Sequence, residues 1–278
     1  MTGTSCAAAV LARAHRLLPG TCRSVHTAMF VDTRALGTVP DDMCPLGARP
    51  VALTGVPRVA TAYVWGSHDA TVLALHGWGT DSTAMSPVVR AATAHGESAV
   101  CFDAPGHGIS PGRQATITEY ARATTEVLQR FPGIHTIVAH SLAALAAISA
   151  VTEYGHGRVR NVVLLAPACS LSVVLERWSR QRRLRRPVID GIYRELADRD
   201  GIPVSHWDIR TLGVPASVRL LLLHDPTDDV VPIDDSYAIA AATDTDVART
   251  RPGTGHHGIV GSDEMRAVLA ACLTASSQ

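Results

Sequence analysis

Residues 134–150 read IHTIVAHSLAALAAISA, in which an apolar run leads through the pair His140–Ser141 into an alanine-rich run. A short apolar run is typical of a strand buried in a parallel sheet, and alanine is the strongest helix former. The sequence therefore predicts a strand-to-helix junction at Ser141. A serine in this place is either a nucleophile or the N-cap of the helix. The G-x-S-x-G motif of such nucleophiles has glycine where this chain has Ala139 and Ala143.

The same alternation of strand and helix extends in both directions from this junction. Apolar or alternating runs predict further strands at residues 59–65, 71–75, 98–102, 159–165, 218–223 and 246–251. Helical spacing predicts helices at residues 84–95, 117–131, 142–154, 236–242 and 264–273. Strands that alternate with helices form parallel sheets through right-handed crossovers. We therefore expect an α/β fold with a mostly parallel central sheet and helices on both faces.

Two parts of the chain lie outside this alternation. Residues 169–212 contain two helix-like stretches, no strand-like run and the arginine-rich sequence RWSRQRRLRRP. We interpret them as a small helical cap inserted into a core made of residues 50–168 and 213–278. Residues 1–49 form an N-terminal extension, in which residues 5–18 have the pattern of an amphipathic helix.

Composition and charge exclude several classes of function. All 25 basic residues are arginine, so no lysine is present to form a Schiff base, a pyridoxal-phosphate linkage or a P-loop. A formal net charge of zero is untypical of nucleic-acid-binding proteins, and no segment has the length and apolarity of a membrane span. The six cysteines form no C-x-x-C pair, and the N-terminus lacks a signal-peptide pattern. We therefore expect a cytoplasmic protein with reduced thiols.

Polar residues follow the predicted strands at the points where these end. In an open parallel sheet, ligands bind beyond the carboxyl ends of the strands, so these residues are expected to lie close together. They belong to five short motifs, in chain order HGWG (76–79), DAPGHG (103–108), AHSLA (139–143), HDPTDDVVP (224–232) and GTGHHG (253–258). A serine, an acid and a histidine thus lie beyond three different strand ends.

The five motifs in this order resemble those of the α/β-hydrolase superfamily, over roughly residues 50–278. The resemblance is to serine hydrolases with a short helical cap, which use the chain order Ser…Asp…His. It implies that Ser141 is the nucleophile, His256 its base and Asp228 the acid that orients the base. It also implies an oxyanion hole formed by the backbone N–H groups of Trp78 and Leu142, and no need for a metal or an organic cofactor.

Neighbouring residues compete for two of these roles. Asp225, Asp228 and Asp229 all follow the same predicted strand. The family pattern selects Asp228, which lies four residues after the histidine at the end of that strand, whereas we expect Asp225 to stabilise the turn with the proline that follows it. The G-H pattern likewise selects His256 over His257. Alanine at the two positions that flank the serine predicts a more crowded elbow that still satisfies the requirement for small residues.

The resemblance also suggests which residues surround the substrate. The candidates for the pocket are Trp78, His140, Trp178, Trp207 and His257. His76 and His107 are instead expected to brace the HGWG and DAPGHG loops through hydrogen bonds. The arginine run has two interpretations, a solvated helix face or a docking patch for an anionic partner, and it comprises Arg177, Arg180, Arg182, Arg183, Arg185 and Arg186.

Three functional hypotheses follow. The first is a serine hydrolase that cleaves an ester, lactone or thioester of a small-molecule acyl substrate through an acyl-enzyme on Ser141. The second is a tailoring thioesterase, acyltransferase or cyclase whose substrate is bound to an acyl carrier protein or to coenzyme A, with the arginine-rich cap as the docking site. The third is a non-catalytic α/β-hydrolase-like binding protein.

Overall fold

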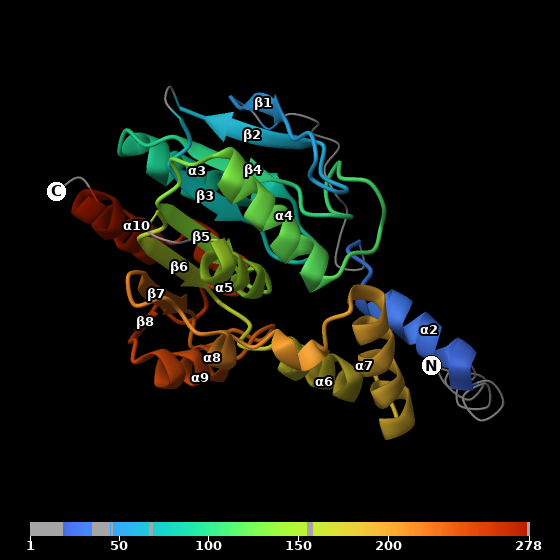
Figure 1. The fold of residues 1–278 in the computed structure, drawn as a ribbon. Helices are drawn as coiled ribbons and strands as arrows, with labels where there is room; N and C mark the ends of the chain where they lie inside the picture. Colours follow the sequence, from blue (N-terminus) through green and yellow to red (C-terminus); the bar gives the residue numbers. More distant parts are fainter. Residues whose placement is uncertain (1–18, 35–44, 46, 67–68, 155–157, 277–278) are drawn as a thin grey trace, which may run out of the picture.

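A computed structural model describes residues 19–34, 45, 47–66, 69–154 and 158–276 of the chain (Figure 1). The amphipathic helix that we predict over residues 5–18 lies outside the described residues. Among the described residues, no helix combines the length and the apolar character needed to cross a membrane.

An eight-stranded sheet forms the centre of the fold, in the order β1-β2-β4-β3-β5-β6-β7-β8. The strands β1 and β2 are antiparallel to their neighbours, and all pairs from β4 to β8 are parallel. The predicted mostly parallel sheet is thus confirmed. The strands are β1 (Arg49–Ala52), β2 (Thr61–Trp65), β3 (Val72–Leu75), β4 (Ala99–Phe102), β5 (Thr136–His140), β6 (Asn161–Leu165), β7 (Arg219–His224) and β8 (Val247–Arg249).

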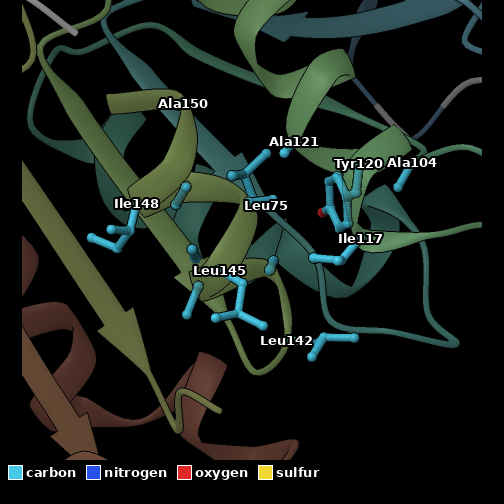
Figure 2. Close-up of a cluster of buried hydrophobic side chains, with 14 of the residues drawn as sticks. Leu75, Ala104, Ile117, Tyr120, Ala121, Leu142, Leu145, Ile148 and Ala150 are labelled. Carbon is cyan, nitrogen blue, oxygen red and sulfur yellow. The ribbon is translucent and has the colours of Figure 1, made fainter. Parts of the chain in front are cut away.

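Helices cover both faces of this sheet. The larger helices of the core are α3 (Ser86–Ala94), α4 (Ile117–Arg130), α5 (Ala143–Tyr154), α9 (Asp234–Thr243) and α10 (Asp263–Ser276). Alternate residues of the central strands enter two separate apolar clusters: Leu73 and Leu75 of β3 pack with α4 and α5, whereas Val72 packs with α3 and α10. Figure 2 shows the first cluster, with Leu75, Tyr120 and Leu145 between the sheet and the helices. Because both faces are buried, these strands read as continuous apolar runs.

The start of α4 shows how local sequence sets a helix boundary. Thr116 is the N-cap: its hydroxyl accepts a hydrogen bond from the Glu119 N–H, and the Glu119 carboxylate accepts one from the Thr116 N–H. This reciprocal pair is a capping box, and such caps contribute about 1 kcal/mol to helix stability. The helix begins beside the predicted site and positions the Tyr120 hydroxyl, which donates to the His76 carbonyl (2.9 Å).

The segment between β6 and β7 is helical, as expected for a cap. It contains α6 (Leu171–Gln181), α7 (Arg186–Asp200), a 3-10 turn η2 (Val204–His206) and α8 (Ile209–Leu212). Its first helix is tied to the core by an ion pair between Arg177 and Asp235 (2.6 Å). The other carboxylate oxygen of Asp235 accepts the backbone N–H of Cys169, where the chain leaves the core (3.1 Å).

The described part of the N-terminal extension lies on this cap. Helix α2 (Pro19–Phe30) packs against α7 (Figure 1). The two helices meet closely at Gly191, where an added Cβ would lie 2.9 Å from the side chain of Arg23. The sequence provided no basis for predicting the packing of α2 against α7, because the pattern of residues in one helix does not indicate a partner so distant along the chain.

Candidate active site

The junction between β5 and α5 is a strained elbow at Ser141. Its φ is +58°, a left-handed conformation that costs a residue with a Cβ about 1–2 kcal/mol. The backbone is held there by a hydrogen bond from the Ser141 N–H to the Leu165 carbonyl (2.9 Å). Ala139 and Ala143 are completely buried, so the fold accommodates the two methyl groups that replace the motif's glycines.

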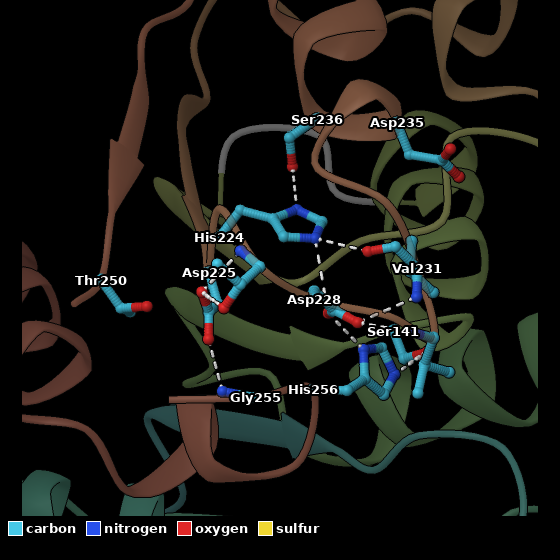
Figure 3. A network of polar contacts seen from close by, with 12 residues as sticks. Ser141, His224, Asp225, Asp228, Val231, Asp235, Ser236, Thr250, Gly255 and His256 are labelled. Carbon is cyan, nitrogen blue, oxygen red and sulfur yellow. Dashed lines mark hydrogen bonds and ion pairs between the residues drawn. The ribbon is translucent and has the colours of Figure 1, made fainter. Parts of the chain in front are cut away.

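The hydroxyl of Ser141 points to a histidine from a distant loop. The Oγ atom lies 2.9 Å from Nε2 of His256, and Nδ1 of His256 lies 2.7 Å from Oδ2 of Asp228 (Figure 3). All three side chains are buried or nearly so. The structure therefore brings the predicted serine, histidine and aspartate into one hydrogen-bonded line, with the geometry expected of a nucleophile, a base and an orienting acid.

Several donors keep Asp228 ionised. Its Oδ1 atom accepts the backbone N–H groups of Val230 (2.8 Å) and Val231 (3.0 Å). Burial by itself would raise the pKa of Asp228, but hydrogen bonds from His224, His256 and the Val231 N–H hold the pKa well below its ordinary value. The carboxylate is thus available to accept a hydrogen bond from the Nδ1–H group of His256.

His224 is a part of this network that the sequence did not reveal. The residue ends β7 and is fully buried, with Nε2 2.9 Å from the Val231 carbonyl and 3.5 Å from Oδ2 of Asp228. Its Nδ1 atom lies 2.7 Å from the Ser236 hydroxyl. A carbonyl only accepts, so we assign the ring proton to Nε2 and the Ser236 hydroxyl as the donor to Nδ1. The only sequence signal was the position of this histidine at the end of the strand before the acid.

Asp225 connects the acid loop with the histidine loop. It accepts the Thr227 N–H (2.8 Å) and hydroxyl (2.9 Å), as expected for a turn residue. It also accepts the Gly255 N–H at 2.5 Å, directly before His256 (Figure 3). Asp225 thus joins the loop that carries Asp228 to the loop that carries His256, a role that the sequence prediction did not include.

The two expected oxyanion donors are free to bind a ligand. Within the described part of the chain, the backbone N–H groups of Trp78 and Leu142 donate to no other group. The two histidines that we expect to brace the loops both contact the neighbouring loop. His76 of the HGWG loop accepts the N–H of Ala104 in the DAPGHG loop at Nε2 (3.0 Å). The His107 ring of the DAPGHG loop meets the Trp78 indole edge to face, with ring centroids 4.9 Å apart.

A cavity of about 490 Å³ opens beside Ser141, a volume typical of small-molecule sites. Four of the five predicted pocket residues line it: Trp78, Trp178, Trp207 and His257. The prediction for His140 is wrong. That residue ends β5 and is buried behind the base, with Nε2 2.8 Å from the His256 carbonyl. Its side chain supports His256 because the last residue of the strand faces into the protein.

One wall of this cavity was not predicted from the sequence. Residues 29–32, which follow α2 or end it, line the cavity together with cap residues and core residues. No pattern in the sequence connects these residues with a serine more than a hundred positions later. In the described ranges, no group of three or more metal-binding side chains is gathered in one place.

Buried neutral histidines are expected to make the fold sensitive to acid. Burial, reinforced by a neighbouring histidine, lowers the pKa of His107 and of His140 to about 3. The unfolded chain binds these protons near pH 6.5, so the stabilising contribution is complete above that pH and falls as the pH drops toward 3. From pH 6.5 to 5.5 the two residues together should remove about 2 kcal/mol from the free energy of unfolding.

Urea unfolding at pH 7.5, 6.5 and 5.5 measures this effect. The urea midpoint should decrease across the series, and His140→Gln should reduce the loss by about 1 kcal/mol. A free energy of unfolding that is constant or rises on acidification would contradict the assignment of neutral buried rings.

Comparisons with known proteins agree on the architecture. The family model described as "Serine aminopeptidase, S33" matches residues 66–200, a little under half of the chain. No curated protein matched the sequence. Among solved structures, mouse alpha/beta hydrolase domain-containing protein 10 is similar with a TM-score of 0.63 at 16% identity, covering 82% of this chain and 96% of that one. An esterase from Pyrococcus furiosus gives 0.56 at 19% identity (82% and 90%). A monoacylglycerol lipase from Paleococcus ferrophilus gives 0.57 at 19% identity (78% and 98%).

Proposed function

We propose that this chain is a member of the α/β-hydrolase superfamily and a serine hydrolase that cleaves an ester, lactone or thioester through an acyl-enzyme on Ser141. The observation that carries the proposal is the line of hydrogen bonds from Asp228 through His256 to Ser141, which ends at the wall of a largely apolar cavity. Two of the similar structures belong to an esterase and a monoacylglycerol lipase, which is consistent with the proposal.

The mechanism follows from the geometry of the site. His256 Nε2 accepts the proton of the Ser141 hydroxyl as the oxygen attacks the carbonyl carbon of the substrate, and then returns that proton to the leaving group. The charge that develops on the carbonyl oxygen is stabilised by the N–H groups of Trp78 and Leu142, each worth about 3 kcal/mol in the transition state. Asp228 holds the imidazole in the tautomer that receives the proton. Water, activated by the same histidine, releases the acyl group.

One observation favours the second candidate, an enzyme that acts on a thioester of a phosphate-bearing carrier. Two members of the arginine run have carboxylate partners, Arg177 on Asp235 and Arg186 on Glu176 and Asp190. The exposed residues Arg180, Arg183 and Arg185 form no ion pair with a described residue. Arg182 lines the cavity, with its guanidinium 4.2 Å from the centroid of the Trp178 ring. Arginines in this arrangement suit a phosphate group at the mouth of the cavity.

A substrate panel tests both candidates and the binding-protein alternative. The purified chain is assayed with p-nitrophenyl esters and with acyl-coenzyme A thioesters, beside the His256→Ala variant. We expect ester turnover that falls by roughly 10⁴-fold or more without His256. Turnover that is unchanged in the variant, or absent with every substrate, would contradict the hydrolase. If the carrier hypothesis holds, Arg183→Gln and Arg185→Gln, two exposed residues that do not line the cavity, weaken thioester turnover and leave ester turnover intact; equal effects on both would contradict it.

A further inference from the structure

A short segment of the N-terminal extension is fixed to the core beside the cavity. We call residues 29–34 the strap. Its residue Asp32 forms a β-bridge with Gln114, flanked by hydrogen bonds from the Thr33 N–H to the Arg113 carbonyl (3.0 Å) and from the Ala115 N–H to the Val31 carbonyl (3.1 Å).

Buried side chains, as well as the backbone, attach the strap to the core. The Thr33 hydroxyl donates to the carbonyl of Gly106 in the DAPGHG loop (2.5 Å). Val31 and Thr33 are 3% and 1% exposed. The strap is therefore an integral part of the structure around the site rather than a loose tail, because its polar backbone groups and its side chains have partners in the core.

The strap also grips the cap through one aromatic contact. The Phe30 ring meets the Trp178 indole edge to face, with centroids 5.3 Å apart and planes at 74°. The Arg182 guanidinium contacts the same indole, and all three side chains line the cavity. The Trp178 indole is thus held both by the strap and by the end of its own helix, and Phe30 forms part of the cavity wall that the cap alone would leave open.

Helix α2 fixes the strap to the cap a second time. Glu195 of α7 accepts a hydrogen bond from the Ser24 hydroxyl (3.2 Å) and lies 3.5 Å from the Arg23 guanidinium. The strap follows directly from this helix, so the position of Phe30 is set by contacts at both ends. A side chain held in this way presents a wall of defined shape to a ligand.

The charges around the cavity indicate what kind of group fits there. Three carboxylates line it, Asp32, Asp200 and Asp229, against the guanidiniums of Arg177 and Arg182. The charge of Arg177 is already balanced by Asp235 outside the lining. An anionic group inside the cavity would meet more negative than positive charge, whereas a neutral apolar group would bury its surface against the aromatic and aliphatic walls.

We propose that the strap is the specificity-determining wall of this cavity, that Phe30 limits the length of the acyl chain, and that the acyl group is neutral and apolar. The inference rests on the proposed function, because it assigns the cavity to the acyl portion of the substrate. It locates a determinant of selectivity in the N-terminal extension, outside both the matched family segment and the cap.

The test is a series of p-nitrophenyl esters from acetyl to dodecanoyl, hydrolysed by wild type, Phe30→Ala and Phe30→Leu. Phe30→Ala is expected to move the optimum of kcat/KM to longer chains, by about fourfold for each additional methylene that the enlarged cavity buries. Phe30→Leu should give an intermediate shift. The control is Val25→Ala, an exposed residue of the same helix that does not line the cavity, which should leave the profile unchanged.

An equal change at every chain length in Phe30→Ala would overturn the proposal, since a purely structural role of the strap predicts a uniform loss. Circular dichroism of each variant identifies failure to fold, and Phe30→Leu retains most of the packing volume if the alanine variant unfolds.

A second measurement does not depend on catalysis. Methyl alkyl ketones are unreactive mimics of the ester, and their binding is followed through the fluorescence of the cavity tryptophans Trp78, Trp178 and Trp207. Phe30→Ala should strengthen binding of the long ketones relative to the short ones. If Phe30→Ala shifts ketone binding but no ester is hydrolysed, the role of the strap is supported and the hydrolase function is rejected. If the wild type hydrolyses esters but Phe30→Ala shifts neither the chain-length profile nor ketone binding, the role of the strap alone is rejected.

Discussion

Ser141→Ala is expected to reduce kcat/KM for an activated ester by roughly 10⁴-fold or more, as large an effect as the loss of His256. Without the hydroxyl no acyl-enzyme forms, and only the oxyanion donors and the cavity remain to assist attack by water. Initial rates with p-nitrophenyl esters, at protein concentrations determined from absorbance, give the ratio of kcat/KM between wild type and variant.

The matched control for this change is Ser172→Ala. Ser172 is a half-buried serine of α6 that does not line the cavity, and its removal should alter kcat/KM by less than about twofold. Thermal unfolding of both variants separates lost chemistry from lost structure. An Ser141→Ala protein that is folded and still hydrolyses esters near the wild-type rate would show that the nucleophile lies elsewhere.

Asp228→Asn should have an effect almost as large, about 10⁴-fold on kcat, as in other triads where this acid is neutralised. An asparagine amide beside His256 Nδ1 donates where the carboxylate accepts, and it therefore fixes the proton on Nε2, the atom that must receive the proton of the Ser141 hydroxyl. The amide oxygen is expected to take the place of Oδ1, which accepts the N–H groups of Val230 and Val231, so the amide nitrogen faces His256 Nδ1.

Asp229→Asn provides the comparison, since it changes the neighbouring carboxylate, which is exposed at the cavity. Its effect should stay below about tenfold, because no hydrogen bond or ion pair joins Asp229 to the His256 imidazole and Asp229 is not needed to orient the ring. A greater loss in Asp229→Asn than in Asp228→Asn would reverse the assignment of the acid.

The sequence predicted the parts of the molecule whose pattern is imposed by local burial. β3, β5 and β6 are buried on both faces, so their apolar runs and the motifs at their ends could be recognised in the sequence. The order of the motifs then indicated the serine, the acid and the histidine. β1 was not predicted because it is an exposed edge strand of sequence RPVA, with a proline and no apolar run.

The remaining features depend on contacts between distant parts of the chain. His140 was assigned to the pocket because it precedes the nucleophile, but the direction of a side chain at a strand end is set by the sheet and not by sequence adjacency. His224 and Asp225 support the triad through hydrogen bonds to residues that only the folded loops bring near. Phe30 meets Trp178 across 148 positions, and no local pattern in either segment predicts the other.

Covalent trapping tests the central claim most directly. The purified protein is treated with a fluorophosphonate, digested and analysed by peptide mass spectrometry, in parallel with Ser141→Ala and with wild type unfolded before labelling. We predict one adduct per chain, on the peptide that carries Ser141, formed only by the folded wild type because attack requires the hydrogen bond to His256. An adduct on another residue, or equal labelling of the Ser141→Ala variant, would contradict the assignment of Ser141 as the nucleophile.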